Sequence, residues 1–506
     1  MHLLTIVAFA FLFWRAEQPG RWVLVPAGDV LWTIVIVLGQ FASVGVLAFL
    51  AQRRASRLFH SDPESSDAAQ QFHHRASSLL RVLLGIGFGI TVFLTRWPEW
   101  FDVTEQTPIL QIVCDFFVLI PFLAGLFVMW LAAYPLERRM RFGDVGPLDE
   151  DEPASWPFRA YIDFHLRHYV LVVAVPMSFI LLAANLTRGH AAKLQAWSGV
   201  SWMPDLLLGL VACVVFLVAP DMLRRIWRTE SLDEGPVRDR LDRLAGRIGL
   251  RFRDILLWKS DGLMINAAVM GLIPSMRYVL LSDALLSSMS ERQVEAVFGH
   301  EAGHVQHRHI QHFLVFAYVG WLAVAAVIEI IAAGALAMDV DVRTAVPIVE
   351  GIGFLATLVV WGVGFGWLSR RFERQADLFA ARCVTPPAEQ CDCPCSVHPN
   401  DSEELPGEGR VCATGAALFV SALDRVATLN GIPHEEYSWR HSSIGIRIRF
   451  LTSLAGDPNR VARFERVIRR AKRFMMTFAV LGTAMAVGYW YFVSEPAFWQ
   501  LHATTP

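Results

Sequence analysis

The chain has 506 residues, of which 54% are hydrophobic and only 18% are charged. This balance is typical of polytopic membrane proteins and excludes an ordinary set of soluble domains. The formal net charge of −2 shows no basic excess, so no nucleic-acid partner is expected.

The apolar runs predict the membrane spans, because crossing a bilayer takes about 17 to 25 residues. Eight runs reach this length, at residues 30–51, 78–95, 109–134, 168–185, 203–222, 310–338, 346–368 and 474–493. Residues 3–14 are a shorter candidate for a ninth span, since the N-terminus lacks the basic start and cleavage site of a signal peptide. Acids within spans usually face protein or a wet cavity, which we expect for Glu329, while Asp115 and Glu350 could instead reach water at span ends.

Arginines in the connecting loops predict the orientation, because Lys and Arg of short loops stay in the cytoplasm. The loops after residues 51 and 134 are rich in arginine, whereas the next loops, near residues 96–108 and 185–202, are acidic or weakly basic. Alternation then places residues 223–309 and 369–473 in the cytoplasm. Lysine occurs only at positions 193, 259 and 472, which favours a GC-rich bacterial source and hence the bacterial inner membrane.

The pattern predicts a mainly α, polytopic membrane protein with a small β-sheet. An amphipathic helix is expected over residues 236–249, followed by three short β-type runs at 253–260, 264–271 and 277–283. The expected parts are an N-terminal transmembrane region, a polar domain interrupted by a two-span hairpin and a Cys-rich loop, and a C-terminal transmembrane helix and tail. The N-terminal region is predicted at residues 1–225 and the C-terminal helix and tail at 474–506. The polar domain is predicted at 226–473, with the hairpin at 310–368 and the Cys-rich loop at 383–412.

The stretch "SERQVEAVFGHEAGHVQHRH" contains the pattern H-E-x-x-H on a predicted helix. Ser290 and Gln293 form a capping-box signature, so the helix is expected to begin at Glu291. On a helix His300 and His304 share one face, so both imidazoles can reach one zinc ion while Glu301 takes a proton from the attacking water. His307 and His309 are expected only to surround this site, with His309 near the lipid headgroups.

A catalytic zinc ion needs a third protein ligand. The metzincin pattern is excluded, because its glycine and its last histidine are replaced by His307 and Ile310. The segment "SRRFERQADLFA" offers Glu373 and Asp377 on one helical face. One carboxylate could bind zinc while the other accepts the free N–H of a ligand histidine.

The order of "HEAGH", a membrane hairpin and "SRRFERQADLFA" resembles the integral-membrane zinc metallopeptidase family of the HtpX heat-shock protease and the CAAX prenyl endopeptidases. The resemblance covers residues 236–455 and implies a gluzincin-like protease domain. It implies that His300, His304 and Glu373 bind Zn²⁺, that Glu301 is the catalytic base, and that Asp377 orients a ligand histidine.

Two more segments resemble that family. "WRHSSIGIRIRFL" resembles its H-P-P-x-x-x-R-I block, with serines in place of the prolines, which implies that His441 or Arg447 faces the developing oxyanion. "INAAVMG" resembles its edge strand, so the backbone at Asn266 and Ala267 is expected to pair with an extended substrate.

Five cysteines cluster in or beside a loop that is predicted to be cytoplasmic, where thiols stay reduced. They are Cys383, Cys391, Cys393, Cys395 and Cys412. Their spacing favours a second, structural metal, with zinc as the first choice and an iron–sulfur cluster as the second, although a flexible loop without metal is the alternative. An inverted topology would favour disulfides instead.

Together these patterns predict a zinc endopeptidase that cleaves membrane or membrane-associated proteins at the cytoplasmic face, in quality control or processing. Its expected partners are protein or peptide substrates and the lipid bilayer, and the sequence indicates no oligomeric state. The alternative is a membrane transporter or sensor with a structural or regulatory zinc site, which Glu301 argues against because such a site needs no base.

Overall fold

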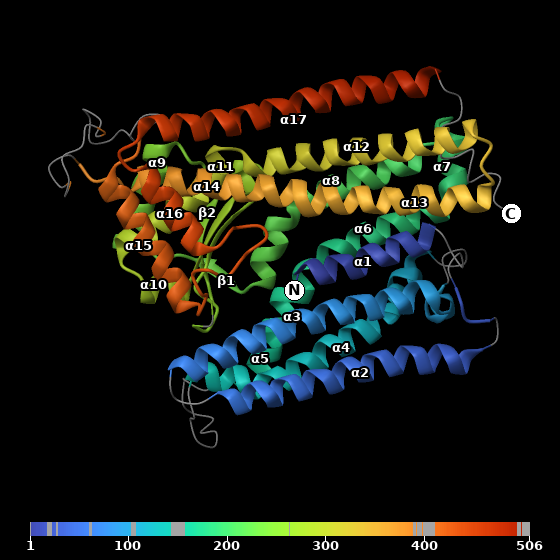
Figure 1. Cartoon of the computed structure of the whole chain (residues 1–506), viewed down its shortest axis with the longest axis horizontal. Coiled ribbons are helices and arrows are strands. Elements are labelled where there is room, and N and C mark those ends of the chain that lie inside the picture. Colours follow the sequence, from blue (N-terminus) through green and yellow to red (C-terminus); the bar gives the residue numbers. More distant parts are fainter. Residues whose placement is uncertain are drawn as a thin grey trace. The chain divides into compact units, whose positions relative to one another are not determined.

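The computed structural model describes residues 2–17, 23–26, 29–59, 63–102, 108–142, 157–262, 264–387, 391, 397, 410–492 and 497. The chain divides into two compact units, Met1–Arg228 and Thr229–Pro506. The first unit consists of helices, and the second combines helices with a small sheet (Figure 1). The predicted fold class, a mainly α polytopic membrane protein with a small sheet, is confirmed.

The first unit contains five long apolar helices at the predicted spans. They are α2 (Val30–Leu58), α3 (Pro63–Leu94), α4 (Pro108–Phe142), the continuous helix Phe158–Gly189 that contains α6 (Val172–Gly189), and α8 (Met203–Ile226). The candidate ninth span falls in α1 (His2–Glu17), a helix of 16 residues. Asp115 accepts hydrogen bonds from Gln111 (2.9 Å) and Asn185 (3.1 Å), so it meets protein donors within its span.

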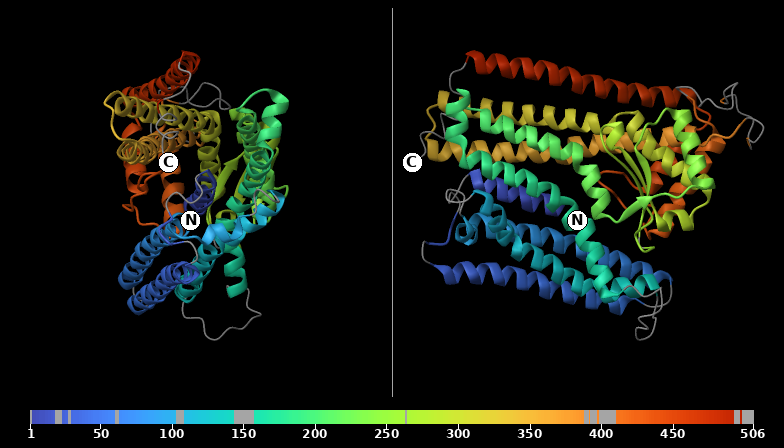
Figure 2. Two further views of the ribbon diagram at one scale, coloured as in Figure 1. Left: turned by 90° about the vertical axis from the view of Figure 1, so that its right-hand side faces the viewer. Right: turned by 180° about the vertical axis from the view of Figure 1, so that it is seen from behind.

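The second unit contains a four-stranded sheet in the order β1-β2-β4-β3. Its strands are β1 (Thr229–Ser231), β2 (Asp254–Trp258), β3 (Ala267–Met270) and β4 (Tyr278–Ser282). The three predicted β runs form β2, β3 and β4, whereas the short polar β1 had no sequence pattern to reveal it. Among the described residues β3 pairs only with β4, so the other edge of β3 carries no strand there. Figure 2 shows the sheet.

Helices cover the sheet and enclose one hydrophobic core. They are α9 (Pro236–Ile248), α10 (Asp283–Ser288), α11 (Glu291–Gln306), α14 (Gly366–Cys383), α15 (Ala413–Leu429) and α16 (Ile444–Leu454). Every residue of β4 is buried, and its Val279 and Leu281 share a hydrophobic cluster with Phe298 of α11 and Leu378 of α14. The helices α11 and α14 are thus held together by the same core.

The membrane hairpin joins these two helices. It consists of α12 (His309–Ala337) and α13 (Val342–Val359), and the latter continues through a π-helical turn, Val360–Phe365, into α14. The result is one uninterrupted helix from Val342 to Cys383, 42 residues long.

The last predicted span lies in α17 (Pro458–Phe492), which packs beside α12 (Figure 1). Tyr318 of α12 lies 2.7 Å from Thr483 of α17, hydroxyl to hydroxyl. Glu329 accepts hydrogen bonds from the Tyr489 hydroxyl and the Ala497 N–H, so this predicted interior acid does meet protein donors. Seven helices are long and apolar enough to span a membrane among the described residues, and α17 is not one of them, so its span stays a prediction.

Candidate metal centre

The helix that carries the H-E-x-x-H pattern begins at Glu291, as predicted. The Ser290 hydroxyl accepts the Gln293 N–H and the Gln293 side chain accepts the Ser290 N–H, which completes the capping box. This start fixes the helical register, so that His300 and His304 lie one turn apart and their rings pack edge to face, 5.0 Å apart.

Two glycines let α14 approach this helix closely. A Cβ atom on Gly299 would lie 3.0 Å from the Cβ of Cys383, and one on Gly303 would lie 3.0 Å from the Cα of Ala376. The glycines are four residues apart and therefore line one face of α11. This contact brings residues 373–377 of α14 against the two histidines.

Glu373 completes a group of three side chains that could hold a metal ion. The Nε2 atoms of His300 and His304 are 3.3 Å apart, and they lie 3.6 Å and 3.8 Å from the nearer Glu373 oxygens. Tetrahedral ligands at zinc distances are about 3.3–3.4 Å apart, so this donor set fits a zinc ion. It is the only His, Cys, Asp and Glu group with such spacing in the described part of the chain.

Asp377 lies behind the first histidine, fully buried. Its carboxylate lies 3.0 Å from Nδ1 of His300 and also accepts the Nε (2.9 Å) and Nη2 groups of Arg447. Burial by itself lowers the pKa of His300, but the hydrogen bond and charge of Asp377 outweigh it and raise this pKa. Asp377 thus contacts Nδ1 of His300, and its role in orienting a ligand histidine stays a prediction that this contact supports.

The second histidine, His304, has a neighbour that the sequence did not predict. His309, which we expected near the headgroups, is fully buried, with its Nδ1 2.9 Å from Nδ1 of His304 and its Nε2 3.0 Å from the Gln375 oxygen. Burial, followed by the charge of His300, lowers the pKa of His304 to about 4, so its ring is neutral at pH 7. A neutral imidazole is the form that binds a metal.

Glu301 points toward the edge strand. Its Oε2 accepts the N–H of Val269 in β3 at 3.2 Å. Burial raises the pKa of Glu301, while the charge of His300 acts in the opposite direction. A carboxylate with a raised pKa is a stronger base than an exposed one.

The two residues predicted to face an oxyanion occupy different environments. Arg447 is buried, with its charge between Asp377 and Glu373, and the pKa of Arg447 is raised because these carboxylates outweigh the effect of burial. The His441 side chain is 48% exposed, and its Nδ1 lies 2.9 Å from Glu373. Of the two, only His441 is accessible to a substrate.

The predicted substrate-binding residues lie where β3 begins. The Asn266 carbonyl accepts the Ser282 N–H at 3.0 Å and so extends the pairing with β4, while the Asn266 side chain accepts the N–H of Ala267 at 3.0 Å. The free edge of β3 therefore runs past Glu301.

The predicted cysteine site is only partly described. Cys383 is buried in the hydrophobic core, whereas Cys391 and Cys412 lie together, with their sulfurs 3.6 Å apart. Cys393 and Cys395 lie outside the described residues.

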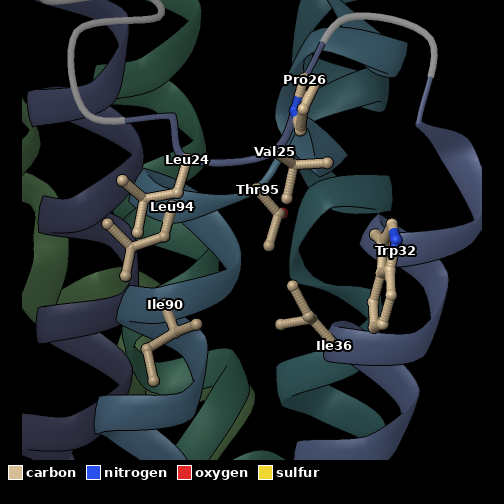
Figure 3. Close-up of a pocket in the computed structure, with 8 residues that line it drawn as sticks. All are labelled: Leu24, Val25, Pro26, Trp32, Ile36, Ile90, Leu94 and Thr95. Atoms are coloured by element: carbon tan, nitrogen blue, oxygen red, sulfur yellow. The ribbon is translucent and has the colours of Figure 1, made fainter.

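A pocket of about 260 Å³ in the first unit has a different character (Figure 3). Its lining is apolar except for the Thr95 hydroxyl, which donates to the Thr91 carbonyl at 2.6 Å. It offers no side chain that could bind a metal or transfer a proton.

Several known proteins are similar to this chain. Residues 231–442 match the model of peptidase family M48. A protease HtpX homolog from Aeropyrum pernix is 24% identical over 281 residues, which cover 51% of this chain and 88% of that protein. A protease HtpX homolog from Paracidovorax citrulli is 27% identical over 239 residues, which cover 44% of this chain and 79% of that protein. The crystal structure of S. mikatae Ste24p aligns with a TM-score of 0.45 and 16% identity over 83% of this chain and 99% of that one.

The apolar helices and the family match together define an integral-membrane metalloprotease. Within that class, residues 231–442 match peptidase family M48 and the chain is similar to HtpX proteases, as the sequence motifs predicted.

Proposed function

We propose that the protein is a zinc endopeptidase that hydrolyses membrane or membrane-associated proteins at the cytoplasmic face of a bacterial inner membrane. One observation carries the proposal: His300, His304 and Glu373 converge beside the partly buried Glu301, which accepts the Val269 N–H of the edge strand β3. Metal ligands, a base and a substrate-binding edge are thus adjacent.

Each residue has a proposed role. His300, His304 and Glu373 would hold a zinc ion, which would supply Lewis-acid chemistry for the scissile carbonyl. Glu301 takes the proton of the attacking water and passes it to the leaving amine, a transfer that its raised pKa supports. His441 donates to the developing oxyanion, and Arg447 holds Asp377 and Glu373 in place.

The substrate is proposed to bind as an added strand on β3, with the backbone at Asn266 and Ala267 as part of its edge. The Val269 N–H now donates to Glu301 and would be one of the groups available to an extended peptide. Extended binding requires a locally unfolded segment, which supports a role in quality control or in processing of flexible termini.

The cytoplasmic location is supported by the arginine-rich loops. A second zinc ion in the Cys-rich loop is also proposed, with Cys391 and Cys412 as the described members and Cys393 and Cys395 as candidates. Cys383 fits that site less well, because it is buried in the core beside Gly299.

The proposal is tested by cleavage of casein or a membrane-protein substrate with detergent-purified protein. Glu301→Gln should lower kcat by about 10²- to 10⁴-fold, because it removes the base without removing a metal ligand. Zinc at the catalytic site should stay at one ion per chain, and a second ion per chain would support the cysteine site. Glu291→Gln is the control, since Glu291 lies in the first turn of the same helix. Equal activity of Glu301→Gln and wild type would contradict the mechanism.

A further inference from the structure

The interior contains a hydrogen-bonded pair of side chains behind His304 that the mechanism above does not use. His309 is fully buried, and its ring stacks on Phe372 at 4.2 Å with only 2° between the planes. Its two nitrogens face two partners, Nδ1 of His304 at 2.9 Å and the side-chain oxygen of Gln375 at 3.0 Å.

The directions of these hydrogen bonds follow from the site. Nε2 of His304 faces His300 and Glu373, so as a metal-binding atom it carries no proton. Nδ1 of His304 then carries the proton and donates to Nδ1 of His309. Nε2 of His309 consequently carries the proton of that ring and donates to the Gln375 oxygen. Both nitrogens of His309 and Nδ1 of His304 then have a hydrogen-bond partner while both rings are neutral.

We propose that His309 and Gln375 are positioning residues that fix the tautomer and orientation of His304 for zinc binding. The inference rests on the proposed zinc site. It adds that the two histidines of that site are oriented by different kinds of partner. His300 is oriented by the carboxylate of Asp377, whereas His304 is oriented by an uncharged chain that ends in an amide.

The backbone is arranged so that this contact can form. On a continuous helix a residue five positions after His304 would point about 140° away from it. Arg308 has a left-handed conformation, with φ of 54°, and separates α11 from α12. His309 thereby turns back onto His304, and Phe372 and Gln375 of α14 hold it from the other side.

The test measures zinc affinity by competition with a chelator, together with the visible spectrum of the cobalt-substituted protein, in the full-length chain. His309→Leu removes the acceptor for His304 and should weaken zinc binding by about 10- to 100-fold and alter the cobalt spectrum. His309→Asn places an amide oxygen where Nδ1 was, so its zinc affinity should return to within a few-fold of wild type. Gln375→Leu should give a smaller loss than His309→Leu.

His312→Leu is the matched control. His312 lies one turn further along α12 and also contacts Phe372, but its Nδ1 lies 2.7 Å from the Arg308 carbonyl rather than from a ligand. Its zinc affinity should equal that of wild type. Thermal unfolding of the metal-free proteins shows whether each variant is folded.

The inference is overturned if His309→Leu is folded and binds zinc as tightly as wild type, or if His309→Asn loses as much affinity as His309→Leu. The readout does not depend on substrate, so it is separate from failure of the proposed protease function. If the chain binds one zinc ion through His300 and His304 but cleaves nothing, only the proposed protease function is overturned.

Discussion

Asp377 connects two groups within the site, the guanidinium of Arg447 and the ring of His300. It receives two guanidinium nitrogens of Arg447 and lies 3.0 Å from Nδ1 of His300, with no exposed surface. Breaking one side of a buried ion pair leaves the other charge uncompensated. The residue therefore matters for both stability and metal geometry.

We predict that Asp377→Asn lowers the free energy of unfolding by about 3–5 kcal/mol and weakens zinc binding. Denaturant unfolding and chelator competition measure the two effects. Asp242→Asn is the control, because Asp242 belongs to a more exposed ion pair with Arg238. A loss of zinc affinity without a loss of stability would show that the Arg447 pair contributes little.

The sequence predicted most of the residues at the site because they follow local patterns. The i, i+4 spacing of His300 and His304 and the separate "ERQAD" segment need only helical geometry, and the structure brings them together. His309 could not be found in this way, because its contact depends on the left-handed Arg308. A non-glycine residue gives no sequence signal for such a conformation.

At the scale of elements, the contact between α11 and α14 sets the distance between the histidines and Glu373. Gly303 faces the backbone of Ala376, so any added side chain must move α14. The stripe of Gly299 and Gly303 is therefore part of the metal site although neither glycine has a ligand atom.

We predict that Gly303→Val destabilises the fold by about 1–3 kcal/mol and reduces zinc affinity, because it forces the helices apart. Equilibrium unfolding and chelator competition measure these effects. Gly246→Ala in α9 is the control, since a Cβ there meets no atom within 4 Å. Unchanged zinc affinity in folded Gly303→Val would show that Glu373 tolerates movement of its helix.

Lys472 of α17 lies against the end of α11. Its ammonium donates to the His307 carbonyl at 2.7 Å and lies 5.1 Å from the centre of the Phe372 ring. Burial lowers the pKa of Lys472 to about 8. The unfolded chain, with an ordinary lysine pKa of about 10.4, holds more protons between these values.

The stability contributed by this residue should therefore rise with pH between about 8 and 10.4. Thermal unfolding at several pH values should show this rise in wild type and a flatter profile in Lys472→Met. Lys259→Met should keep the wild-type profile, because Lys259 is an exposed partner of Glu230. A wild-type slope in Lys472→Met would assign the rise to another group.

At the scale of the whole molecule, the sequence predicted the membrane helices well, because span length and apolarity are local properties. Seven predicted spans are confirmed as helices. The sheet order β1-β2-β4-β3 and the contribution of β1 could not be predicted, because they depend on pairing between segments distant in sequence.

The predicted topology places the loop near residues 185–202 outside and the residues after 223 in the cytoplasm. Reporter fusions after Gly199 and after Gly235 test this in a bacterial host. Alkaline phosphatase should be active only at the first position, and green fluorescent protein should fluoresce only at the second, because each folds in one compartment. The reverse pattern would place the active site outside and make disulfides the expected state of the Cys-rich loop.

The uninterrupted helix from Val342 to Cys383 restricts how the chain can change in length. Residues added at the turn between α12 and α13 leave α14 where it is. One residue added between Phe365 and Glu373 would rotate everything beyond it by about 100°. Glu373, Gln375 and Asp377 would all lose their partners together. Insertions and deletions should therefore be tolerated at the turn between α12 and α13. They should not be tolerated between Phe365 and Glu373.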